Sequence, residues 1–80
     1  MIIYRTFDGD NHEYFATERV ALNAADRVFE QENQGPNGFI RVEKITLRDG
    51  LTTPALVAMI FNQDPEAVAS VERTYERLSS

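Results

Sequence analysis

The chain has 80 residues, with eight basic and thirteen acidic side chains, a formal charge of −5 and no cysteine. This length fits one small domain, so we expect residues 1–80 to form a single globular unit. Without cysteine there are no disulfides, no thiolate metal sites and no cysteine nucleophile, and a single histidine argues against a zinc site or a Ser-His-Asp triad. The apolar fraction of 42% supports a modest core and is too high for a disordered chain.

We expect a cytoplasmic protein that makes no contact with a membrane. The first ten residues lack the basic start and long apolar run of a signal peptide. The longest apolar run, 55–61, is far shorter than the roughly 20 residues needed to cross a bilayer. If the protein comes from a phage, the predicted location is the cytoplasm of the host cell.

The first half of the chain predicts a β-hairpin followed by an amphipathic helix. Residues 2–7 and 12–15 are rich in β-branched and aromatic side chains and flank a turn of Asp, Gly and Asn residues. Thr17 is a suitable helix N-cap, and helical spacing continues to about Asn33, after which a Gly-Pro pair at 35–36 ends the helix. The predicted apolar face comprises Ala21, Leu22, Ala25, Val28 and Phe29.

The second half predicts a strand, an ambiguous apolar segment and a helix. Residues 39–47 are strong strand formers, and the Asp-Gly pair at 49–50 is typical of a hairpin. Segment 51–61 suits a returning strand by length, whereas its Thr-Pro pair at 53–54 is typical of a helix start; we favour the strand. Asp-Pro-Glu at 64–66 indicates a final helix. Its apolar stripe comprises Ala67, Val68, Val71, Tyr75 and Leu78.

These elements follow one another in the order ββαββα and predict an α+β fold. Two amphipathic helices can cover one face of a small antiparallel sheet. We therefore expect a small two-layer sandwich, with the sheet in one layer and both helices in the other.

No motif in the sequence indicates catalysis or ligand binding. Segment 8–12 begins like a calcium loop, but the sixth and twelfth positions hold Glu13 and Arg19 where such a loop needs Gly and Glu. His12 stands beside Glu13 without a second histidine or a nucleophile. All four glycines lie where turns need them and form no phosphate-binding pattern. We expect no catalytic residue, no cofactor and no metal.

Residues 39–48 combine local positive charge with an aromatic side chain, as in sheets that hold single-stranded nucleic acid. The group comprises Phe39, Arg41, Lys44 and Arg48. A domain of charge −5 is repelled by phosphates at long range. We therefore favour ion pairs with the neighbouring acids Glu43 and Asp49, and expect no direct nucleic-acid binding.

Several acidic residues lie where they lower the stability of the chain. One group crowds the first turn with no base between its members, and another lies in the first helix as like charges four residues apart or near the negative end of the helix dipole. Solubility is one explanation, and a surface that binds a basic partner is the other. The candidate contact residues are Asp8, Asp10, Glu13, Asp26, Glu30 and Glu32, with Tyr14 as either an anchor or a core residue.

A short strand or hairpin, a helix that starts at Thr17-Glu18 and a second hairpin that begins at 40–45 and ends in Asp49-Gly50 follow one another in this acidic chain. In that form it resembles the small acidic proteins that phages encode as anti-CRISPR inhibitors. The resemblance implies a non-enzymatic inhibitor that binds a type I CRISPR surveillance complex and blocks its basic DNA-binding surface. The alternative is a small bacterial regulatory or structural interaction module, with a second copy packed on the apolar run 55–61.

Overall fold

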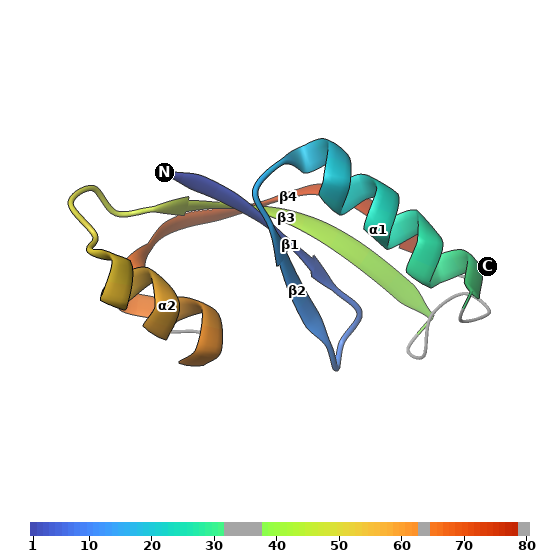
Figure 1. Ribbon diagram of the computed structural model, residues 1–80. Coiled ribbons are helices and arrows are strands. Elements are labelled where there is room, and N and C mark those ends of the chain that lie inside the picture. Colours follow the sequence, from blue (N-terminus) through green and yellow to red (C-terminus); the bar gives the residue numbers. More distant parts are fainter. Residues whose placement is uncertain (32–37, 63–64, 79–80) are drawn as a thin grey trace.

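The computed structural model describes residues 1–31, 38–62 and 65–78 (Figure 1). The described strands form one antiparallel sheet in the order β2-β1-β3-β4. Together with two α-helices they confirm the predicted α+β class. In chain order the elements are β1 (Ile2–Phe7), β2 (His12–Phe15), α1 (Glu18–Gln31), β3 (Phe39–Leu47), α2 (Thr53–Asn62), the 3₁₀ turn η1 (Pro65–Ala67) and β4 (Val68–Leu78).

The predicted hairpin and first helix are confirmed. β1 and β2 pair from Tyr4 opposite Phe15 to Phe7 opposite His12. Thr17 caps α1, because the backbone N–H of Val20 donates to the Thr17 hydroxyl oxygen at 3.3 Å. The helix buries Ala21, Ala25 and Phe29, while Leu22 and Val28 pack at the margin of the same cluster. The predicted end of the helix at 33–36 lies outside the described residues.

The predicted strand over 51–61 is wrong, because residues 53–62 form helix α2. The chain turns at Gly50, which has a φ of 78°, but then enters a helix that begins beside Thr52. The Thr52 hydroxyl oxygen accepts from the backbone N–H of Ala55 at 3.4 Å, and its carbonyl accepts from the N–H of Leu56 at 3.1 Å. The capped Thr-Thr-Pro start therefore outweighs the length and turn signals that favoured a strand.

The predicted final helix is also wrong, because only residues 65–67 form a helical turn and residues 68–78 form strand β4. The register of β4 on β3 shifts between Val42 and Glu43 and again between Thr46 and Leu47. Each shift adds an unpaired residue to β4, at Thr74 and at Ala69. These bulges break strict alternation, so the apolar residues of a strand acquire a spacing typical of a helix. Asp64, the first residue of the predicted helix start at 64–66, lies outside the described residues.

The helices lie on opposite faces of the sheet, so the prediction that they share one face is wrong (Figure 1). α1 packs on a cluster that includes Ile40 and Val42 of β3. Leu56 of α2 packs on a second cluster, built around Ile45 and Leu47 of the same strand. Successive side chains of a strand point to opposite faces, which separates the two clusters. β3 consequently buries apolar side chains on both faces and forms the centre of the sheet's packing.

Candidate protein-binding surface

The turn between β1 and β2 is built around the carboxylate of Asp8, which is 4% exposed. Its Oδ1 accepts from the backbone N–H groups of Asp10 at 2.9 Å and Asn11 at 2.8 Å, and its Oδ2 accepts from the Asn11 side-chain amide at 3.4 Å. Burial opposes ionisation, but these hydrogen bonds outweigh it and lower the pKa of Asp8 below its ordinary value. Gly9 supplies the positive φ of 102° that the turn requires. Asp8, a predicted contact residue, therefore holds the turn in shape.

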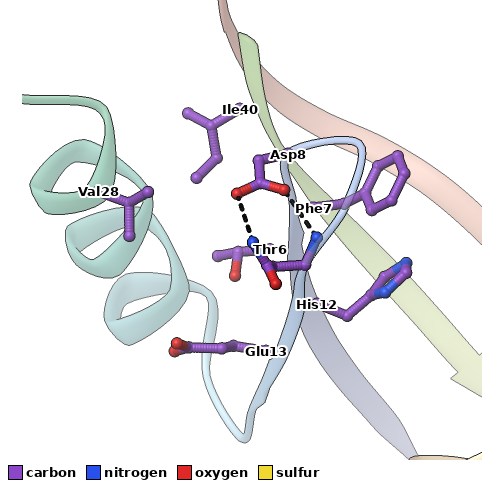
Figure 2. Close-up of a pocket in the computed structure, with 8 residues that line it drawn as sticks. Thr6, Phe7, Asp8, His12, Glu13, Val28 and Ile40 are labelled. Carbon is purple, nitrogen blue, oxygen red and sulfur yellow. Dashed lines mark hydrogen bonds between the residues drawn. The ribbon is translucent and has the colours of Figure 1, made fainter. Parts of the chain in front are cut away.

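A hollow of about 250 Å³ opens between this turn and α1 (Figure 2). The Glu13 carboxylate lies on the α1 side of β2, whereas His12 points to the other side of the strand (Figure 2). Asp10 and Glu13 are both exposed. The lining contains no lysine or arginine and comprises Thr6, Phe7, Asp8, Asn11, His12, Glu13, Val28 and Ile40. The structure thus brings Asp8, Asp10 and Glu13 together at an acidic corner, the name used below for these three residues.

Two other predicted contact residues, Asp26 and Glu30, are engaged within the protein. Asp26 Oδ1 accepts from the Tyr75 hydroxyl at 2.7 Å and from Arg77 Nη1 at 3.1 Å. The same Arg77 nitrogen lies 3.7 Å from Glu30 Oε1, and the guanidinium stacks 4.2 Å from the centre of the Phe29 ring. Burial, followed by the bond to Asp26, raises the pKa of Tyr75. These contacts join α1 to β4, so the two acids stabilise the fold. The positive charge of Arg77 partly compensates their negative charges.

Tyr14 packs at the margin of the cluster beneath α2 and lies opposite Arg5 in the hairpin. Arg5 in turn pairs with Glu43, with Nη2 at 2.7 Å from Oε1. Burial lowers the pKa of Arg5, but hydrogen bonds to Glu43 and Tyr14 outweigh it and raise the pKa overall. Tyr14 is therefore half-buried in a network that spans β2, β1 and β3. Glu32, the last predicted contact residue, lies outside the described residues.

The basic group predicted on residues 39–48 does not share one surface. Lys44 lies opposite Tyr4 of the α1-side cluster, whereas Arg41 lies opposite Phe7 on the other face. Arg41 pairs with Glu76 of β4, with Nε at 3.2 Å from Oε2. The preference for ion pairs was thus correct for Arg41, although the partner is Glu76 and not a neighbour in the sequence.

An aromatic group that was not predicted from the sequence lies on the sheet face opposite α1. The rings of Phe7 and His12 stack with centroids 4.5 Å apart, and the Phe39 ring meets Phe7 edge-on at 6.1 Å. The Arg41 guanidinium lies 5.8 Å from the centre of Phe7 and 5.2 Å from that of Phe39. Burial, followed by repulsion from Arg5, lowers the pKa of His12 and so favours the neutral imidazole. Alternation along each strand shows which of these residues share a face. Only the register between strands brings them next to one another.

Comparison with protein-family models, with curated proteins and with solved structures found no match. Among the described residues, no group of three or more His, Asp and Glu side chains is placed to hold a metal ion. Over the same ranges, no helix has the length and apolar character needed to span a bilayer.

Proposed function

We propose that the protein is a non-catalytic inhibitor that binds a basic protein surface through its acidic corner. The observation that carries this proposal is the pair of exposed carboxylates, Asp10 and Glu13, beside a hollow whose lining has no lysine or arginine. The Asp8 hydrogen bonds hold the turn that presents them. A pre-shaped acidic corner attracts a basic surface during encounter and loses little conformational entropy on binding.

The overall charge supports the same role. A body of charge −5 is steered towards a positive surface and away from nucleic acid. Arg77 already pairs with Asp26 and Glu30, so we give these two acids a smaller part in the proposed interaction. The acidic corner thus carries more of the proposed interaction than α1 does.

The partner that we propose to test first is a type I CRISPR surveillance complex, in the cytoplasm of the host cell. Such a complex must hold DNA on a positively charged surface, because phosphate contacts dominate DNA affinity. An acidic protein seated on that surface would exclude the DNA. The form of the chain, which resembles phage anti-CRISPR inhibitors, supports this choice of target.

The test measures binding of the purified protein to a purified type I surveillance complex, together with binding of target DNA by that complex, over a range of salt concentrations. Glu13→Lys should slow association by about fivefold to tenfold at low salt, and the difference should shrink as salt is added. Glu72→Lys is the matched control: it makes the same change in net charge on an exposed residue of β4, at the opposite edge of the sheet. No complex at low salt, or equal effects of the two variants, would refute the proposal.

A further inference from the structure

The aromatic–arginine patch, defined as Phe7, His12, Phe39 and Arg41, lies on a part of the sheet that neither helix cluster includes. α1 packs on the opposite face. On the patch's own face, the residues packed beneath α2 and η1 are centred on Ile45 and Leu47, at the other end of β3. The patch is therefore a section of sheet face without a described helix over it.

The patch is ordered by its own contacts and remains accessible. Phe7 contacts each of the other three members, and every member is half-buried. Leu78 lies directly opposite Phe39 in the register and is 67% exposed, which extends the apolar surface to the edge strand β4. Aromatic and arginine side chains held in fixed positions are the residues that contribute most to binding energy in protein interfaces.

The charges of this face disfavour a nucleic acid as the occupant. Arg41 and Arg73 both pair with Glu76, at 3.2 and 3.3 Å, and Arg5 pairs with Glu43. These three arginines face only two carboxylates, so the pairs keep one positive charge, which attracts phosphates weakly on a chain whose overall charge is −5. A second copy of the chain is also disfavoured, because it would bring two bodies of charge −5 together.

The charges beside the patch favour a basic protein. Phe7 and His12 belong both to the patch and to the lining of the hollow that contains Asp8 and Glu13. The Phe7 and His12 side chains lie on the face opposite α1, whereas the Glu13 carboxylate lies on the α1 side, so the patch and the acidic corner meet at the turn where Asp8 follows Phe7. A matching partner would place an apolar side chain on the patch and lysine or arginine side chains near the acidic turn.

We propose that the patch is the anchoring part of the interface, and that it takes an apolar or aromatic side chain of a protein partner whose surrounding surface is basic. This inference rests on the proposed function, because the acidic corner supplies the attraction and the patch then sets the lifetime of the complex. Apolar anchors act mainly on dissociation, whereas charges at the rim of an interface act mainly on association.

The test uses three probes and the intact protein, followed by the chemical shifts of its amide and aromatic groups. The first probe is a synthetic peptide with a tryptophan-leucine centre flanked by lysines; the second replaces those lysines by glutamates; the third is a single-stranded DNA oligonucleotide. The lysine-flanked peptide should shift the resonances of Phe7, His12 and Phe39. Phe39→Ala should weaken its binding at least tenfold. Leu78→Ser, a change at an exposed position that spares the fold, should weaken it severalfold.

Val20→Ser is the matched control, because Val20 is 51% exposed on α1 and lies outside the patch. Its binding to the lysine-flanked peptide should equal that of the unmodified protein. The inference is overturned if the peptide does not bind, if its shifts map elsewhere, if the oligonucleotide or the glutamate-flanked peptide occupies the patch, or if the patch mediates self-association. These outcomes do not depend on the surveillance complex, so failure of that target is distinguished from failure of the patch.

Discussion

The Asp8 carboxylate offers the sharpest test of how the acidic corner is held. Asp8→Ala removes the acceptor of two short bonds from backbone N–H groups, at 2.9 and 2.8 Å. Hydrogen bonds to charged groups contribute about 1.5–3 kcal/mol, and water can solvate the exposed Asp10 and Asn11 amides once they are released. We therefore expect a loss of about 2 kcal/mol in the free energy of unfolding, which for a domain of this size lowers Tm by about 8–16 °C.

Asp8→Asn separates the charge from the hydrogen bonds, because an amide oxygen still accepts while the negative charge is gone. Its cost should be about 1 kcal/mol at pH 7. The native pKa of Asp8 is lowered, so the stability due to its charge is present above the unfolded value of about 3.9 and is lost as pH falls through the native pKa. The difference between the unmodified protein and Asp8→Asn should shrink accordingly in acid.

Urea unfolding at a series of pH values measures both effects. Glu13→Ala is the control, since it removes an exposed carboxylate from the neighbouring strand and should change stability by less than about 0.5 kcal/mol. An Asp8→Ala protein as stable as this control, or an Asp8→Asn difference that persists unchanged in strong acid, would refute the role assigned to Asp8.

Three further predictions concern other parts of the fold. Gly50→Ala should cost about 1 kcal/mol in urea unfolding, purely from the backbone, because φ is 78° and an added Cβ meets nothing within 4 Å; an unchanged midpoint would contradict this. Arg5→Leu should cost about 3 kcal/mol by leaving the carboxylate of Glu43 buried and unpaired, and the double variant with Glu43→Leu should recover most of that loss; full additivity of the two changes would argue against the pair. Titration of tyrosinate absorbance should show a step above the ordinary tyrosine pKa, and Tyr75→Phe should remove that step, since burial and the bond to Asp26 both raise the pKa of Tyr75.

Elements with agreeing local signals were predicted from the sequence. The hairpin over 2–15 has strand formers on both sides of a turn, and α1 has a cap, a helical period and an apolar face. Segment 53–62 had no such agreement, because the length of its apolar run favoured a strand whereas its Thr-Pro start favoured a helix. In segment 68–78 the local signals agreed on a helix and were wrong, because the bulges at Ala69 and Thr74 gave the apolar residues of a strand the spacing of a helix.

The candidate site was predictable only in part, for the same reason. Asp8, Asp10 and Glu13 are neighbours in the sequence, so their clustering was visible there. The engagement of Asp26 by Arg77 joins residues far apart in the chain and depends on β4 being a strand beside α1. The sequence therefore predicted more acidic contact residues than the structure leaves without an ion pair to Arg77.

The amino-acid sequence by itself determined the size, the acidity, the α+β class and the first hairpin and helix, because composition and short-range patterns act within a few residues. The tertiary structure alone decided which face of β3 each helix covers. It likewise decided which acidic residues form ion pairs with arginines of the same chain. It also decided that Phe7, His12, Phe39 and Arg41 meet. Those outcomes depend on cross-strand register, which is set by the packing of the whole sheet and not by any one segment.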